Sequence, residues 1–477
     1  MAAESRSGTG PRPRTTFVVG SGPNGLTAAI IMAQAGRRVT LFEAQPSIGG
    51  GARSAELTLP GFVHDVCSAI HPLGVGSPVF RSFPLQQFGL EWIHPPLPLA
   101  HPLDDGTAAV LARSVEETAT RLGEDEGSYR RLMNSAVTHW DELSGLALSP
   151  RIPRHPWLLA RLSWGALQPV ARLARRRFRG LHARALLAGL GAHALLPLED
   201  LGTSAVALAL AVAGHAVGWP FPRGGSQRLA NALAAYAQSL GVEIRTGTRL
   251  TSFKELPRGA DVLCDVTPRQ LLELGGQDLP PALRRRLRRY RYGMAAYKVD
   301  WALSGPIPWR AAECRQAGTV HLGGELEEIA AGERAACRGL TPERPFVLLA
   351  QQSLFDPSRA PSGRHTAWSY CHVPNGSQAD MLPRIEAQIE RFAPGFRHLI
   401  LARSVMPPSQ LEAHNANLVG GDISGGSMDF RQMFLRMAAR PSTSSPWRVY
   451  LCSSSTFPGP GVHGMCGYFA AKACLRA

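Results

Sequence analysis

The glycine-rich stretch near the amino terminus constrains the fold of this chain more than any other feature. Residues 15–19 predict a buried strand, three glycines follow at Gly20, Gly22 and Gly25, and residues 26–34 predict an apolar helix. In such a turn the first glycine allows the tight bend, the second lets the backbone approach a pyrophosphate, and the third lets the helix pack close to the strand. The phosphates would then lie at the positive N-terminus of the helix. The pattern predicts the opening of a dinucleotide-binding βαβ unit.

The residues after this turn continue the same pattern at the expected intervals. Ala29 and Ala33 keep one side of the helix small, Gly36 ends the helix, and residues 39–42 predict a second strand. Glu43 stands at the end of that strand, where a carboxylate can accept hydrogen bonds from the hydroxyls of a ribose. A plain α/β turn without a ligand would explain each feature singly, but it does not explain the register of all of them.

Length and charge limit the classes of function. At 477 residues the chain is long enough for two domains, each with its own core. The net charge is +15, yet only three of the 51 basic residues are lysines, namely Lys254, Lys298 and Lys472. This skew indicates biased codon usage rather than selection for phosphate binding, and no segment resembles a DNA- or RNA-reading module. We therefore expect no nucleic-acid partner.

The cysteines and the apolar segments bear on location. Eight scattered cysteines lack a C-x-x-C pair and the spacing of metal ligands, so we predict no metal site and expect a reducing cytoplasm. Residues 1–14 predict a disordered tail without the apolar core of a signal peptide. The longest apolar run, 204–219, is shorter than the roughly 20 residues of a membrane span, and His215 interrupts it. It predicts a buried helix, with shallow insertion into one leaflet as the alternative.

Nucleotide-binding features recur in three separated blocks. They predict one discontinuous domain built from residues 15–79, 222–279 and 446–477. The two insertions between the blocks, 80–221 and 280–445, would form a substrate-binding domain in which helices over an antiparallel sheet cover a substrate.

Each block has its own signature. The first carries a second glycine loop at 49–53, whose Arg53 could meet the charge of a pyrophosphate. The second begins with a loop at 222–227, followed by a helix and by strands predicted at 248–253 and 261–266.

The third block and the insertions complete the expected elements. The third block combines a predicted strand at 449–451 with a glycine-rich segment and a helix that runs through residue 475. The first insertion is expected to be mostly helical. In the second insertion, strands are predicted at 295–303, 346–353 and 365–372, and an amphipathic helix at 382–392.

These motifs together resemble the superfamily of FAD-dependent amine oxidases and phytoene desaturases. The similarity is strongest to its phytoene-dehydrogenase-related branch, which includes the pyridine nucleotide-disulfide oxidoreductase domain-containing protein 2 group. It covers nearly the whole chain and rests on residues 20–43, 49–53, 222–227 and 461–467. The resemblance implies an α/β protein with a discontinuous, glutathione-reductase-like FAD-binding Rossmann domain and an inserted α+β substrate domain.

The resemblance also implies which residues hold the single FAD. The chain has one nucleotide fingerprint and no second module for a nicotinamide cofactor. It departs from its relatives where consecutive glycines are usual, because Pro460 stands between Gly459 and Gly461 and removes a backbone N–H. The residues expected to bind FAD are Gly20, Gly22, Pro23, Asn24, Gly25, Glu43, Ala44, Gly50, Gly51, Ala52, Arg53, Gly224, Gly225, Ser226, Gly461, Val462, His463 and Gly464.

Three residues are candidates for catalysis. Lys298 lies on a predicted strand of the substrate domain, and in amine-oxidase relatives a lysine on a comparable strand reaches the flavin through a water. The alternative for Lys298 is an ordinary solvent-facing lysine. His71 and His215 follow or precede nucleotide-binding segments and could act as acid or base. For both, and for His463, a structural histidine is the alternative. Cys466 is expected to serve packing rather than covalent flavin attachment.

The arginine-rich segment 284–291 predicts a solvated helix face or a contact with anionic lipid headgroups. The expected function is hydride transfer to flavin from a hydrophobic, unsaturated substrate such as a polyene, isoprenoid or acyl chain. A redox-neutral double-bond isomerase and a non-catalytic flavin-binding partner protein are the alternatives. Oxygen, a quinone or a protein carrier could accept the electrons. We expect a cytoplasmic protein that could contact a membrane peripherally.

Overall fold

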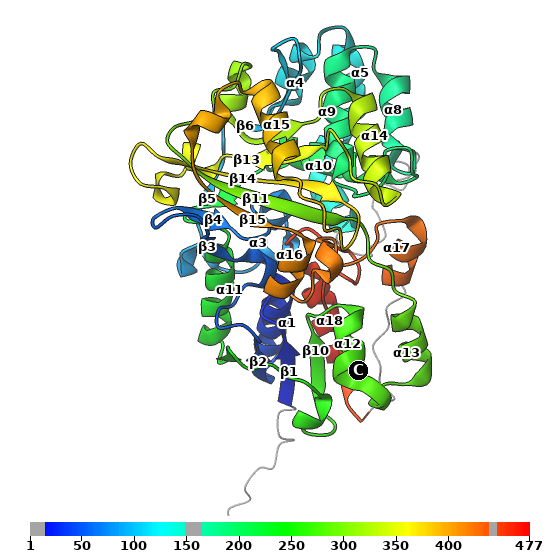
Figure 1. Cartoon of the computed structure of the whole chain (residues 1–477). Helices are drawn as coiled ribbons and strands as arrows, with labels where there is room; N and C mark the ends of the chain where they lie inside the picture. Colours follow the sequence, from blue (N-terminus) through cyan, green and yellow to red (C-terminus); the bar gives the residue numbers. More distant parts are fainter. Residues whose placement is uncertain (1–14, 148–164, 438–445) are drawn as a thin grey trace, which may run out of the picture.

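The computed structural model describes residues 15–147, 165–437 and 446–477. The tail predicted over 1–14 lies outside the described residues. Two large sheets organise the rest, as Figure 1 shows: a smaller sheet with α1 and α18 in the lower half, and a larger sheet above it. Helices α5, α8, α9 and α10 lie beside the larger sheet at the upper right of the view.

The smaller sheet has five parallel strands in the order β16-β10-β1-β2-β9. Its strands come from all three predicted blocks and are β1 (Thr15–Val19), β2 (Arg38–Phe42), β9 (Glu243–Arg245), β10 (Asp261–Cys264) and β16 (Arg448–Leu451). An all-parallel sheet must be covered on both faces. The helices α1 (Pro23–Gln34), α11 (Gln227–Ser239) and α18 (Met465–Arg476) pack on one face, and α12 (Pro268–Gly275) and α13 (Pro281–Arg288) on the other.

One predicted strand of this domain is wrong. Residues 248–253 form no strand, and the segment instead leaves the sheet edge after β9. Two hydrogen bonds tie it to the end of β2, from Gly247 N to Gln45 O and from Thr248 N to Glu43 O, both 2.8 Å. No ladder continues beyond them, because Thr248 to Thr251 turn to line the central cavity described below.

The larger sheet has seven strands in the order β15-β11-β14-β13-β12-β6-β7. Neighbouring strands are antiparallel except β12 and β6. The strands are β6 (Leu97–Pro102), β7 (Ala108–Leu111), β11 (Ala295–Leu303), β12 (Ala317–Leu322), β13 (Val347–Ala350), β14 (His365–Val373) and β15 (Ile400–Met406). Strands β6 and β7 come from the first insertion, whose other long elements are helices, as the sequence predicts.

Alternation along the strands divides this sheet into two apolar faces. Val299 and Trp301 of β11 point to the face covered by α15 (Leu382–Phe392), the amphipathic helix that the sequence predicts. Ala296, Trp368 and Tyr370 point to the opposite face, where α9 (Leu181–Ala192) and α10 (Thr203–Ala216) pack. Because side chains alternate with period two, Lys298 and Asp300 share this second face.

Shorter elements connect the two sheets. Helix α10 accounts for the apolar run at 204–219, and within the described ranges no helix is both long enough and apolar enough to span a membrane. The remaining strands are β3 (Ser54–Glu56), β4 (Val63–Asp65), β5 (Trp92–Ile93) and β8 (Phe221–Pro222). The remaining helices are α2 (Pro72–Val75), α3 (Pro78–Arg81), α4 (Val115–Arg121), α5 (Glu126–Thr138), α6 (Trp140–Ala147), α8 (Val170–Arg177), α14 (Leu326–Cys337), α16 (Pro408–His414) and α17 (Phe430–Met437).

Candidate functional site

A cavity of about 690 Å³ joins the two sheets. We call its two parts the nucleotide half and the substrate half. The nucleotide half is lined mainly by residues 19–24, 42–45, 50–53, 248–251, 265–266 and 459–462. The substrate half is lined mainly by His193, Leu210, Trp219, Ala296, Lys298, Thr319, Leu348, Trp368, Tyr370, Leu411, Leu418 and Ile423. A ligand that crosses the cavity would therefore touch residues from both sheets.

The glycine turn after β1 has the geometry that its sequence predicts. Gly20 adopts a φ of +97°, which only glycine takes without strain. A Cβ at Gly22 would lie 2.5 Å from Oδ2 of Asp265, so a side chain here would clash with that carboxylate. A Cβ at Gly25 would lie 2.0 Å from the carbonyl oxygen of Gly20, which confirms the close packing of helix on strand.

Glu43 is held at the end of β2 with its carboxylate beside the turn. Its Oε2 accepts hydrogen bonds from the N–H and the hydroxyl of Ser21, at 3.0 and 2.5 Å, and its Oε1 accepts one from Gln45 N at 2.8 Å. A carboxylate has about four lone-pair sites, so capacity for a further hydroxyl donor remains. Glu43 and Ala44 both line the cavity, as expected for residues that contact a ribose.

Asp265 is a site residue that the sequence alone does not single out. It follows β10, the strand beside β1, and its Oδ2 accepts a hydrogen bond of 2.9 Å from Gly25 N at the N-terminus of α1. Burial raises the pKa of Asp265 to about 7, the Gly25 hydrogen bond opposes this shift, and the charge of Glu43 adds to it. A carboxyl group therefore titrates near neutrality where a pyrophosphate would lie.

The second glycine loop closes the nucleotide half from the other side. Gly50, Gly51 and Ala52 line the cavity, and a Cβ at Gly50 would lie 3.1 Å from the Cα of Gly22. The Arg53 guanidinium lines the cavity too, and its Nε donates to Gly50 O at 2.9 Å. Burial lowers the pKa of Arg53 from its ordinary value.

The C-terminal motif reaches the same cavity in part. Gly461 and Val462 line it, and Val462 adopts a φ of +49°, a strained conformation for a β-branched residue. His463 and Gly464 lie behind this lining. His463 Nδ1 accepts a 3.0 Å hydrogen bond from Met465 N, and a Cβ at Gly464 would meet Thr27 and Phe80. These two residues shape the start of α18 rather than the cavity surface.

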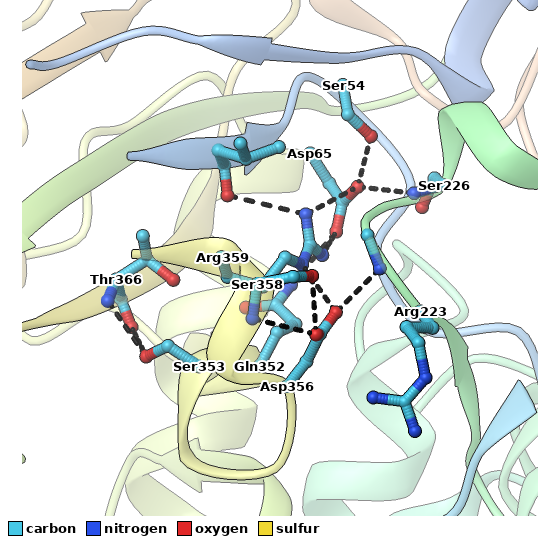
Figure 2. Close-up of polar contacts among 12 residues, drawn as sticks. Ser54, Asp65, Arg223, Ser226, Gln352, Ser353, Asp356, Ser358, Arg359 and Thr366 are labelled. Atoms are coloured by element: carbon cyan, nitrogen blue, oxygen red, sulfur yellow. Dashed lines mark hydrogen bonds and ion pairs between the residues drawn. The ribbon is translucent and has the colours of Figure 1, made fainter. Parts of the chain in front are cut away.

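The loop at 222–227 does not reach the cavity lining. Gly224 N donates to Asp356 Oδ2 at 2.6 Å, and Ser226 N donates to Asp65 Oδ1 at 2.7 Å. Figure 2 shows this cluster, in which Asp65 and Asp356 lie on either side of the buried Arg359. The FAD-binding role of Gly224, Gly225 and Ser226 stays a prediction. What their contacts show is a junction between the first two blocks and the larger sheet.

Charge compensation explains how this cluster stays buried. Burial alone would raise the pKa of Asp65, but the Arg359 charge and hydrogen bonds from Arg359, Ser226 and Ser54 outweigh it and lower that pKa. Gln352 donates to the second oxygen of the same carboxylate at 3.2 Å. Such a paired and hydrogen-bonded buried charge is tolerated, whereas removal of one partner would be costly.

The two predicted catalytic histidines also lie outside the cavity lining. His71 Nε2 lies 2.8 Å from the Ser226 hydroxyl, and its ring packs against Trp92. His215 Nε2 lies 2.8 Å from the hydroxyl of Tyr129. Burial lowers the pKa of each to about 4, so both are neutral near pH 7. A catalytic role for either stays a prediction that these contacts do not support.

Lys298 lies where the sequence analysis expects a catalytic lysine. It is on β11, lines the substrate half and is only 2% exposed. Its ammonium group pairs with the carboxylate of Asp300, two residues along the same strand face. The other oxygen of Asp300 lies 3.6 Å from Nδ1 of His64. Burial raises the pKa of Asp300 to about 6, against the effect of Lys298.

Several lining residues of the substrate half were missed. Trp368 and Tyr370 alternate with buried residues of the other face along β14, and Trp219 and His193 come from the helical insertion. The alternation of the strand at 365–372 is visible in the sequence, but it does not say which face meets the cavity. In the parts of the chain that the structure describes, no group of three or more His, Cys, Asp or Glu is placed to hold a metal ion.

The nucleotide half fits an extended flavin dinucleotide. Gly22 and Pro23 line the cavity at the N-terminus of α1, where a phosphate would lie, and Glu43 keeps acceptor capacity for a ribose. The cavity runs without interruption from that turn to Gly461, so one elongated ligand can touch both.

Comparison with known proteins agrees with this geometry. The family model described as "FAD dependent oxidoreductase" (DAO) matches residues 15–277, more than half of the chain. The rat protein named pyridine nucleotide-disulfide oxidoreductase domain-containing protein 2 is 25% identical, over 96% of this chain and 93% of its own length.

Solved structures share the fold. An oxidoreductase from Methanosarcina mazei superposes with a TM-score of 0.64 at 15% identity, over 97% of this chain and all of its own. Wild-type putrescine oxidase bound to putrescine gives a TM-score of 0.62 at 15% identity, over 98% and 99% of the two chains. The expected mixed α/β, Rossmann-type fold is thereby confirmed.

Proposed function

Because this chain belongs to the FAD dependent oxidoreductase family, we propose that it uses its FAD to oxidise or desaturate a hydrophobic, unsaturated small molecule. A polyene, an isoprenoid or an acyl chain is the substrate class, in line with the phytoene-dehydrogenase-like branch that its motifs resemble. When bound, FAD would accept a hydride, with its two electrons, from one substrate C–H bond, and the proton of the neighbouring C–H bond would pass to water, so that the substrate loses two hydrogens. The protein supplies binding, orientation and electrostatics.

One observation carries this proposal: glycines and polar groups line one end of the cavity, and mainly apolar side chains line the other end. The glycine turn, Glu43 and the segment 459–462 would hold FAD in the nucleotide half. The apolar side chains of the substrate half would then bury an apolar molecule against the flavin end and exclude water from it. Trp219, Leu348 and Trp368 supply much of this apolar surface.

Lys298 is the residue that we place at the reaction centre. Among the described residues, Lys298 is the one cationic residue of the larger sheet that lines the cavity. Asp300 accepts one of its three protons and fixes its direction. The remaining N–H groups of Nζ can hold a water or a substrate oxygen at the boundary between the two halves.

The test follows the absorbance of the bound flavin under anaerobic conditions. The FAD-loaded protein is mixed in turn with a carotenoid polyene, an isoprenoid alkene and an unsaturated acyl ester. We expect bleaching by at least one of them and a product lighter by two hydrogens. A product of unchanged mass would instead indicate an isomerase. Protein that neither carries nor takes up FAD would contradict the proposal altogether. Oxygen, a quinone and a protein carrier are then compared as acceptors of the flavin's electrons.

A cytoplasmic protein that meets a membrane at its surface would suit such a substrate, and we propose one surface for this contact. Helices α13 and α17 lie side by side at one edge of the molecule (Figure 1). Phe430 and Phe434 are 49% and 73% exposed there, beside the exposed Arg285 and Arg289. Exposed aromatic and basic side chains together fit an anionic lipid surface.

Vesicle sedimentation tests this surface. We expect the FAD-loaded protein to sediment with vesicles that contain phosphatidylserine and not with pure phosphatidylcholine. Phe434→Ser should weaken sedimentation, whereas Leu340→Ser, at another exposed apolar residue, should not. Equal sedimentation of the two variants would contradict the proposed contact.

A further inference from the structure

The charged groups of the cavity are unevenly distributed. The charged lining side chains of the nucleotide half are Glu43, Arg53, Arg249, Asp265 and Glu273. In the substrate half, Lys298 is the one charged lining residue within the described ranges, and Asp300 already pairs with it. Any polar group of a substrate beyond Lys298 must therefore be recognised by neutral side chains.

Tyr370 provides the first neutral polar group. It stands directly opposite Lys298 in the antiparallel register of β11 and β14, on the face that lines the cavity. Its ring is fixed between Trp368 and His372, with centroid distances of 5.4 and 5.5 Å. Among the residues that the structure describes, its hydroxyl has no hydrogen-bond partner, and burial raises its pKa so that it keeps its proton.

His193 provides the second. It follows α9, lines the same half of the cavity, and its Nε2 lies 3.0 Å from Nε2 of His321. Burial lowers the pKa of His193 to about 3, so the imidazole is neutral. One of the two facing nitrogens must then donate and the other accept.

The surroundings of His321 indicate which nitrogen donates. Its Nδ1 has no partner in the described part of the chain, and a Cβ at Gly189 would lie 2.8 Å from it. Orphaned N–H groups are rarer in buried positions than orphaned acceptors. We therefore assign the proton of His321 to Nε2, from which it donates to His193. This leaves the proton of His193 on Nδ1, where it can donate to a ligand.

We propose that the substrate is an apolar molecule with one neutral oxygen acceptor, a carbonyl or hydroxyl group, which Tyr370 and His193 hold in the substrate half. The inference rests on the proposed function, because it names the substrate class of the same cavity. An ammonium group would meet no carboxylate beyond Lys298 and Asp300. A carboxylate would be desolvated against two neutral donors. A pure hydrocarbon would leave both buried donors unpaired, which costs binding free energy.

Three matched probes test the inference: geranylacetone, its analogue with a methylene group in place of the carbonyl oxygen, and its primary-amine analogue. Each is titrated into the FAD-loaded protein, and the change in the flavin absorbance gives a dissociation constant. We expect the ketone to bind about tenfold more tightly than the methylene analogue, and the amine to bind most weakly. Failure of all three to bind would contradict the proposed function itself.

Variants separate the oxygen contact from general affinity. Tyr370→Phe removes only the hydroxyl, and His193→Leu removes the second donor, so each should cut the preference for the ketone about threefold or more. His193→Asn keeps an N–H near the Nδ1 position and should retain most of the preference. FAD content and circular dichroism check that each variant folds. Equal binding of ketone and methylene analogue in the wild type, or an unchanged preference in the Tyr370→Phe, His193→Leu double variant, would overturn this inference alone.

Discussion

The two halves of the cavity are lined by different kinds of groups. In the nucleotide half, glycines and backbone groups shape the lining: Gly22 has no side chain to clash with Asp265, Gly25 donates its N–H to Asp265, and Glu43 accepts two hydrogen bonds from Ser21. In the substrate half, side chains such as Trp219 and Tyr370 form the wall. The nucleotide half is therefore suited to one charged cofactor, whereas a few side-chain substitutions would alter which ligand the substrate half binds.

The largest expected effect tests whether space at the turn decides cofactor binding. In Gly22→Val the added Cβ would lie 2.5 Å from Oδ2 of Asp265, so the turn or this carboxylate must shift. We expect the dissociation constant for FAD to rise about a hundredfold or more, equivalent to the loss of two charge-assisted hydrogen bonds. Flavin absorbance after gel filtration measures the retained FAD.

Gly145→Ala is the matched control for this substitution. Gly145 lies in α6, and an added Cβ would meet nothing within 4 Å. This variant should keep its FAD. Wild-type flavin content in Gly22→Val would show that the turn does not approach the pyrophosphate.

The second-largest expected effect tests whether Lys298, at the boundary between the two halves, takes part in the reaction. Lys298→Met keeps the length of the side chain but removes the ammonium group, and Asp300, whose pKa burial raises to about 6, can take up a proton in its place. We expect substrate to reduce the bound flavin about a hundredfold more slowly, with FAD content unchanged. Stopped-flow bleaching measures the rate. Lys254→Met, at a lysine that is 74% exposed, is the control, and equal rates in the two variants would remove Lys298 from the reaction centre.

The two halves also differ in how well the sequence predicts their geometry. The glycine turn, Glu43 and the loop at 49–53 follow the residue spacing of a βαβ unit within the stretch 20–53, so their geometry could be predicted although Glu43 meets Ser21 across 22 residues. Asp265 could not, because it meets Gly25 across 240 residues. The strand predicted at 248–253 is wrong because residues 248–251 line the cavity instead of pairing along the sheet edge.

The substrate half depends on long-range register. Tyr370 meets Lys298 only because β14 pairs with β11. The alternation of the predicted strand at 365–372 allows either face to line a cavity. Likewise, nothing near His215 in the sequence indicates that Tyr129 lies beside it. Lys298 could be singled out because lysine is rare in this chain and the motif resemblance places one on this strand.

A smaller effect concerns charge in the nucleotide half. Burial raises the pKa of Asp265 to about 7, so the group is neutral below that pH and anionic above it. An anion there repels the pyrophosphate, so the dissociation constant for FAD should rise about three- to tenfold between pH 6 and pH 8. Reconstitution of the apoprotein across this range measures it. Asp265→Asn should remove the pH dependence. The same dependence in that variant would assign it to another group.

The smallest functional effect belongs to His215, which the sequence analysis placed near the reaction. In the structure it lies outside the cavity and bonds the buried Tyr129 hydroxyl at 2.8 Å. His215→Leu leaves that hydroxyl without its partner, so we expect the free energy of unfolding to fall by about 1–3 kcal/mol, with flavin reduction unchanged. Urea denaturation and stopped-flow bleaching measure the two. His398→Leu, at an exposed histidine, should change neither. A slowed reduction in His215→Leu without loss of FAD would return this residue to the chemistry, and would mean that the substrate half extends beyond the wall described above.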